Sequence, residues 1–134
     1  MSNSEKSAKK KSTKPTPKNQ MTGWIIRGVV FGALAVLLVL ALLDFQAKQA
    51  ATGMATVWRD AVQKQGETSD LRKSEFDKIP LRGNPSTSSA KAEANSYAAV
   101  TVNTYTWKGT FRSYIVKVYV GMGSDPAIEH VEGP

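Results

Sequence analysis

The sequence predicts an α+β protein: a single N-terminal transmembrane helix continues into an amphipathic helix and then a small three-stranded antiparallel β-meander. Three observations predict it: an apolar run at 24–43, small apolar residues at helical spacing after it, and two β-branched and aromatic runs between 97 and 120. The expected divisions are a disordered basic cytoplasmic tail at 1–21, a transmembrane helix at 22–44, an amphipathic juxtamembrane helix at 45–66 and an extracytoplasmic α+β domain at 67–134.

The apolar run from Trp24 to Leu43 contains one charged residue, Arg27. At about 1.5 Å per residue, a helix of this length spans about 30 Å, the thickness of the hydrocarbon core of a bilayer. Trp24 is an aromatic residue of the kind found at membrane interfaces, and Arg27 lies close enough to the start of the run to reach the headgroups. Because no small-x-small cleavage site follows closely, we expect an uncleaved signal-anchor.

Positive charge is concentrated before this run. Of the formal net charge of +7, residues 1–20 contribute +5 and Arg27 contributes +1, whereas the chain from Asp44 onward is nearly neutral. Basic residues flanking a span are retained in the cytoplasm, so we expect a cytoplasmic N-terminus at the plasma (inner) membrane and an extracytoplasmic C-terminal domain. The residues assigned to anchoring and orientation are Lys9, Lys10, Lys11, Lys14, Lys18, Trp24 and Arg27.

The lysine-rich tail has two interpretations. Its residues are almost all polar, so it has little to bury and we expect it to be disordered. Its lysines either bind the anionic inner leaflet of the bilayer, at about 1 kcal/mol for each residue near the surface, or serve only as an orientation signal. A nucleic-acid partner is not expected, because the tail has no aromatic side chains for base stacking.

Gly28 and Gly32 form a GxxxG pattern inside the apolar run. This pattern lets two helix backbones approach closely, so one interpretation is a helix–helix contact that forms a homodimer. The other is that small residues are frequent in membrane helices.

Small apolar residues continue at helical spacing beyond the run. They are Ala47, Ala50, Met54, Val57 and Ala61. The spacing predicts a narrow apolar face on a helix that reaches about Gln65 and ends at Gly66. This face either pairs with another helix or packs on the core of the domain. The core is favoured, because a small domain without cysteines needs the apolar area.

The remaining elements follow from local patterns. Residues 97–107 and 110–120 predict two strands of a hairpin that turns at Lys108-Gly109, with a bulge near Asn103 where the apolar phase changes, and residues 127–131 predict the third strand. Between the helix and the hairpin, Ser74 and Asp77 predict the N-terminus of a short helix that Pro80 ends. Residues 82–96 predict a mobile surface loop.

We expect no catalytic, cofactor-binding or metal-binding residues. The chain has no cysteine and one histidine, His130, so neither a triad nor a tight metal site can be assembled from the usual groups. The aromatic residues of the predicted strands could form a binding face, but a small sheet needs them for its core. The prediction is a protein that is not an enzyme and has no cofactor.

The C-terminal part resembles the SmpA/OmlA (BamE-like) envelope domains over roughly residues 70–132. The resemblance is carried by Ser74–Ile79 (SEFDKI), by Gly83-Asn84-Pro85, by Tyr105-Thr106-Trp107 and by a second strand that ends at Gly121. Those domains pair helices with a three-stranded antiparallel sheet and are accessory subunits of outer-membrane assembly. The resemblance therefore implies an envelope-binding role. A membrane span stands here in place of their lipidated cysteine.

The architecture is also similar to that of type IV pilins and pseudopilins. A lysine-rich leader ends in Gly23, and Trp24, a hydrophobic run, an amphipathic continuation and a β-meander follow. In that family the leader is cut after the glycine and a glutamate stands five residues further on. Here Gly28 holds that position and Arg27 precedes it.

The sequence thus predicts a single-pass, membrane-anchored protein of the cell envelope, with a small non-catalytic extracytoplasmic domain that binds or scaffolds an envelope protein. The alternative is a type IV pilin-like or pseudopilin filament subunit processed after Gly23. A third hypothesis is that the protein is an enzyme, which would require a cleft with convergent polar groups.

Overall fold

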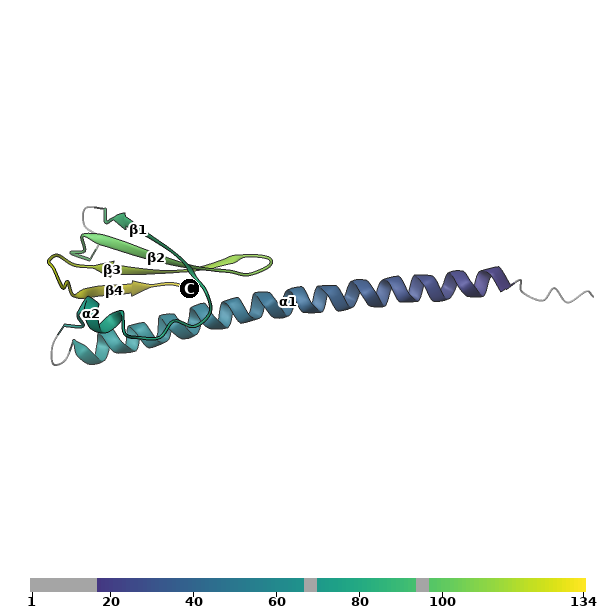
Figure 1. Ribbon diagram of the computed structural model, residues 1–134, viewed down its shortest axis with the longest axis horizontal. Helices are drawn as coiled ribbons and strands as arrows, with labels where there is room; N and C mark the ends of the chain where they lie inside the picture. Colours follow the sequence, from purple (N-terminus) through teal and green to yellow (C-terminus); the bar gives the residue numbers. More distant parts are fainter. Residues whose placement is uncertain (1–16, 67–69, 94–96) are drawn as a thin grey trace, which may run out of the picture. The chain divides into compact units, whose positions relative to one another are not determined.

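The computed structural model describes residues 17–66, 70–93 and 97–134, with side chains from residue 20 onward. Its elements are α1 (Pro17–Gln65), α2 (Lys73–Phe76), β1 (Ser86–Lys91), β2 (Thr101–Lys108), β3 (Ser113–Val120) and β4 (Ile128–Glu132) (Figure 1). The chain is α+β, with a long apolar N-terminal helix and an antiparallel sheet, as the sequence predicts. Its contacts divide it into two units, residues 1–36 and 37–134.

Helix α1 begins at Pro17, five residues before the predicted start at 22. A proline suits the first helical turn, because its fixed φ matches the helix and its missing N–H would have no intrahelical partner there. The part of the predicted tail at 1–16 lies outside the described residues. From residue 20, α1 is long and apolar enough to cross a membrane, and its most apolar stretch is exposed. These properties are compatible with a membrane anchor.

The sheet has four strands in the order β1-β2-β3-β4, so the predicted three-stranded meander is wrong in strand number. The added strand, β1, lies within the predicted loop 82–96 and pairs antiparallel with β2 from Ser86 opposite Thr106 to Lys91 opposite Thr101. Its sequence, STSSAK, is exposed at every position and has no apolar alternation. The strand therefore forms because β2 offers it an edge, and the sequence pattern does not signal it.

Two details of the predicted hairpin are also corrected. The loop between β2 and β3 contains four residues, Gly109–Arg112, instead of a two-residue turn at Lys108-Gly109. Pairing runs without interruption past Asn103, and the bulge lies between Tyr119 and Val120, against β4. The apolar residues of β2 change phase because they lie on both faces of the sheet. Val102 lies on the face opposite to that of Tyr105 and pairs with Tyr119 of β3.

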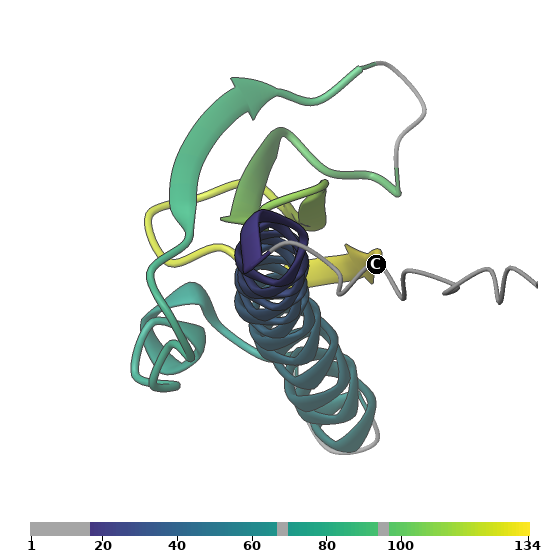
Figure 2. The same ribbon diagram turned by 90° about the vertical axis from the view of Figure 1, so that its right-hand side faces the viewer.

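The amphipathic part of α1 packs on one face of the sheet, which we call the inner face. Its buried residues are Ala51, Met54, Ala55 and Trp58. They pack with buried side chains of the sheet and of the segment around α2: Leu71, Phe76, Tyr105, Trp107, Val116, Val118, Val120, Ile128 and Val131. Figure 2 shows the sheet end-on, with α1 against one face. The helix packs on the core as predicted, but the buried face is shifted from the predicted stripe: only Met54 of that stripe is buried, Ala47, Ala50 and Ala61 are partly buried, and Val57 is 37% exposed.

Trp58 lies at the centre of this core. Its ring centroid is 5.0 Å from that of Phe76, 4.8 Å from that of Tyr105 and 6.2 Å from that of Trp107. Tilted aromatic pairs at such distances add packing energy beyond the area they bury. Three elements, α1, α2 and β2, therefore meet on one indole side chain.

Helix α2 is capped across the chain and not by its own sequence. The predicted local cap by Ser74 and Asp77 is not formed. Instead Asp125, in the loop before β4, accepts the Ser74 backbone N–H (3.0 Å) and the Ser74 hydroxyl (2.8 Å). Asp77 pairs with Lys73 (2.6 Å). The bonds from Ser74 lower the pKa of the Asp125 carboxyl, because they favour its ionised form.

Trp58→Ala is expected to lower the free energy of unfolding by about 3–5 kcal/mol, because it leaves a cavity at the centre of the core. Val57→Ala, on the adjacent and partly exposed residue, is the matched control and should cost about 1 kcal/mol or less. Urea unfolding of the full chain in detergent, followed by the near-ultraviolet circular dichroism of the aromatic side chains, measures both. Equal losses would show that α1 does not supply the core.

The cap on α2 predicts a dependence of stability on pH. A carboxyl whose pKa is lower in the folded state stabilises the fold above its unfolded pKa, near 3.8 for Asp125, and loses this contribution as the pH falls through the lowered value. The stability difference between wild type and Asp125→Ala should be constant at neutral pH and shrink as the pH falls below 3.8 and through the lowered pKa of Asp125. Ser74→Ala, which removes one of the two donors, should show a smaller difference over the same range. Thermal unfolding from pH 7 to pH 2 measures these differences, and parallel curves down to pH 2 would contradict the assignment.

Candidate functional site

The predicted anchoring residues that the structure describes lie on α1. Lys18 is in its first turn, and Lys9, Lys10, Lys11 and Lys14 lie outside the described residues. Trp24, 78% exposed, lines a shallow groove of about 280 Å³ together with Arg27, Gly28 and Phe31. The structure thus brings the predicted anchor residues Trp24 and Arg27 together with the predicted helix-contact residue Gly28.

Gly28 and Gly32 lie on an open helix surface. No atom other than their immediate neighbours on the helix lies within 4 Å of the position that a Cβ would occupy at either glycine. Within a single chain, larger side chains would therefore fit at both positions. The helix–helix contact at these glycines and the homodimer stay predictions.

A cluster that the sequence did not reveal lies where the apolar run ends. Asp44, the residue after Leu43, accepts three hydrogen bonds from the β2–β3 hairpin. The Phe111 N–H (3.1 Å) and the Arg112 N–H (3.4 Å) donate to Oδ1, and the Tyr114 hydroxyl donates to Oδ2 (2.7 Å). The last bond raises the pKa of Tyr114. We call this arrangement the Asp44 clamp.

Gly109 lets the hairpin approach α1 this closely. A Cβ at position 109 would overlap the Oδ1 atom of Asp44 and would also meet the Arg112 carbonyl oxygen at 2.8 Å. The Gly109 N–H donates to that carbonyl (2.9 Å) and closes the four-residue loop. Glycine is therefore required here by the close approach of two backbones and a carboxylate.

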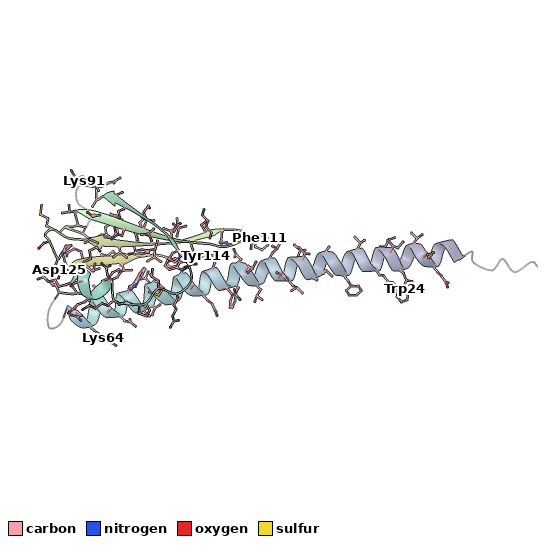
Figure 3. All side chains as sticks on the ribbon, in the orientation of Figure 1. Trp24, Lys64, Lys91, Phe111, Tyr114 and Asp125 are labelled. Atoms are coloured by element: carbon pink, nitrogen blue, oxygen red, sulfur yellow. The ribbon has the colours of Figure 1, made fainter. Side chains whose placement is uncertain are left out.

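The clamped loop carries an exposed aromatic ring, with a cation before it and another after it in the sequence. The Phe111 side chain is 61% exposed, and Lys108 and Arg112 are exposed as well. Figure 3 shows Phe111 and Tyr114 at the end of the sheet opposite to Lys91 and Asp125. The neighbouring apolar residues of α1, Leu43 and Phe45, are also about half exposed.

A second concave surface lies at the other end of the sheet. A groove of about 440 Å³ is lined by Lys73 of α2, by residues of β1, β2 and β3, and by the loop at 121–126. Within it the Ser89 hydroxyl donates to Asn103 Oδ1 (2.6 Å), so these two groups satisfy each other. We call this the distal groove.

The outer face of the sheet carries an aromatic group that the sequence assigned to the core. Tyr97, 53% exposed, stacks on His130 with ring centroids 4.0 Å apart and meets Tyr119 edge-on at 4.9 Å. The Tyr119 hydroxyl donates to Glu132 (2.8 Å), which raises the pKa of Tyr119. His130 therefore packs against tyrosine rings. The described residues contain no group of three or more His, Asp or Glu side chains placed to hold a metal ion.

Comparison of the chain with models of protein families, with curated proteins and with solved structures gives no match. The resemblances to the BamE-like domains and to type IV pilins therefore stay predictions.

Asp44→Ala is expected to release the β2–β3 loop, because it removes the acceptor of three hydrogen bonds. The backbone amides of Phe111 and Arg112 should then exchange with solvent about tenfold faster, while amides in the middle of β3 should change little. Asp60→Ala, which removes an exposed carboxylate from the same helix, is the matched control. Hydrogen exchange measured by mass spectrometry distinguishes them, and unchanged exchange at the loop in Asp44→Ala would contradict the clamp.

Proposed function

We propose that the chain is a single-pass membrane protein whose small extracytoplasmic domain binds or scaffolds another component of the cell envelope without catalysing a reaction. The observation that carries the proposal is the change of environment along α1. Large apolar side chains between residues 21 and 45 are exposed, whereas the apolar stripe from Ala51 to Trp58 is buried against the sheet. One continuous helix thus belongs to a folded domain at one end and needs another apolar environment at the other.

A bilayer supplies that environment. Keeping one Val, Leu, Ile or Phe side chain in water instead of burying it costs about 1.5–3 kcal/mol, and α1 exposes more than a dozen such side chains. Lysines before the run and a nearly neutral chain after it support a cytoplasmic N-terminus. Residues 45–134 then form the extracytoplasmic part.

A binding role is supported by the surface that the core leaves uncovered. The two edges of the sheet differ. Arg59 donates to the Val131 carbonyl (3.4 Å) and to the Gly133 carbonyl on the β4 side, and Arg72 forms an isolated bridge with Ala127. On the other side β1 pairs with no described strand except β2. The β1 edge and the adjoining distal groove are therefore where the domain offers backbone and polar groups to a partner.

The topology can be tested directly, because the chain contains no cysteine. We expect the single-cysteine variant Met122→Cys, at a position 82% exposed in the loop before β4, to react with a membrane-impermeant maleimide in intact spheroplasts. The matched variant Ser4→Cys should react only after the membrane is permeabilised. The reverse pattern, or recovery of the chain in the soluble fraction, would overturn the proposal.

The alternative, a filament subunit, would also have the exposed apolar helix. The two proposals differ in the mass of the mature protein. A pilin-like subunit would lose residues 1–23 on processing, whereas the membrane anchor keeps them. Intact mass spectrometry of the protein extracted from membranes of the same cells decides between the two.

A further inference from the structure

We propose that the loop Gly109–Arg112 is a second membrane contact: Phe111 enters the interfacial region of the bilayer that α1 crosses, and Lys108 and Arg112 bind lipid phosphates beside it. The inference rests on the proposed function, because it requires α1 to be embedded in that bilayer. It adds a contact that sets how the domain stands on the membrane surface.

The clamp places the loop at the level where the apolar run ends. Asp44 directly follows Leu43, and the Phe111 amide nitrogen lies 3.1 Å from the Asp44 carboxylate. Since a helix rises about 1.5 Å per residue, a loop bound at Asp44 lies within a few ångströms of the end of the run. Phe45, beyond Asp44, is 53% exposed, so the apolar surface of α1 continues past the level of the clamp.

The loop has the chemistry of an interfacial segment. The Phe111 ring lies outside the buried core and faces solvent. Aromatic rings are favoured at the headgroup level, and long cationic side chains beside them reach phosphates while their aliphatic stems stay in apolar surroundings. Cations near an anionic lipid surface are attracted to it.

The same contact explains why a carboxylate stands at the end of the apolar run. An unpaired carboxylate close to lipid would be costly to desolvate. Asp44 is provided with three donors, two of them backbone N–H groups of the loop itself. The Asp44 carboxylate thus holds the loop in place, and the donors of the hairpin replace the water that the carboxylate would lose near lipid.

The bilayer is favoured over a protein as the occupant because the loop is continuous with the surface of α1 that needs lipid. Leu42, Leu43 and Phe45 are about half exposed and belong to the helix that carries the clamp. A protein covering Phe111 alone would leave these side chains in water. A second copy of the chain or another protein on the loop is therefore an outcome that the test must distinguish.

The test uses the full chain reconstituted in phosphatidylcholine/phosphatidylglycerol vesicles, with the polarity-sensitive dye NBD attached to a single cysteine. The variant Thr110→Cys keeps Phe111 and reports on the loop. We expect blue-shifted emission and loss of most fluorescence when lipids carry a spin label near the headgroup. Dye at Met122→Cys, in the loop before β4, should be neither shifted nor quenched.

Second-site variants test the cause. Phe111→Ser or Asp44→Ala, added to Thr110→Cys, should shift the emission to the red and reduce the quenching. Thr110 emission that is blue-shifted but insensitive to spin-labelled lipid would place a second copy of the chain on the loop and overturn the lipid contact. Emission at Thr110 equal to that at Met122 would overturn it as well.

A further label separates this inference from the proposed function on which it rests. Dye at Leu38→Cys, inside the apolar run, should be quenched by lipids labelled deep in the acyl chain. Quenching at Leu38 without quenching at Thr110 overturns the loop contact and leaves the membrane anchor in place. Absence of quenching at Leu38 overturns the anchor itself.

Discussion

The packing of α1 against the inner face of the sheet is the constraint on which the rest of the structure depends. Trp58, Met54, Ala51 and Ala55 come from the helix, and without them the sheet would expose its valines and aromatic rings. A domain of this size has little apolar area to spare. The part of α1 that carries these residues therefore belongs to the folded domain.

The β2–β3 hairpin is attached to α1 at two levels. Near its middle, Tyr105 and Val116 contribute to the core around Trp58, and beyond its strands the loop is bound by Asp44. From Asp44 to Trp58 is about 21 Å along the helix at 1.5 Å per residue. Trp107, between these levels, donates its indole N–H to the Arg82 carbonyl (2.7 Å) and so ties the connecting segment to the hairpin. Attachments this far apart prevent the hairpin from pivoting on the helix.

What the sequence could predict was decided by how local each signal is. The apolar run, the stripe through Met54 and the β-branched strands are written in the spacing of neighbouring residues, and the helix, its packing on the core and the main hairpin followed from them. β1 has no apolar face and exists only beside β2. The Asp44 clamp and the cap that Asp125 provides for α2 join residues 67 and 51 positions apart in the chain. No local sequence pattern therefore predicts them. One weak signal for the clamp was present in the sequence: Asp44 directly follows the apolar run, and Gly109 and Arg112 lie close together much later in the chain.

The uneven protection of the two sheet edges bears on how the domain can bind without aggregating. On the β4 side, Arg59 donates hydrogen bonds to the backbone carbonyls of Val131 and Gly133. Arg72 forms a backbone bridge with Ala127, just before β4. β1 offers its backbone, but apart from Ala90 its side chains are polar, and it ends in Lys91. Polar and charged edge strands resist indiscriminate pairing, because a second strand would bury little apolar area. A partner strand at β1, as we propose, would therefore be selected by polar contacts, and the distal groove beside it is lined by polar side chains, among which Ser89 is bonded to Asn103 and Lys73 is paired with Asp77. The clamp and the distal groove lie at opposite ends of the β2–β3 hairpin, so the membrane contact and the partner site that we propose are separated along the sheet.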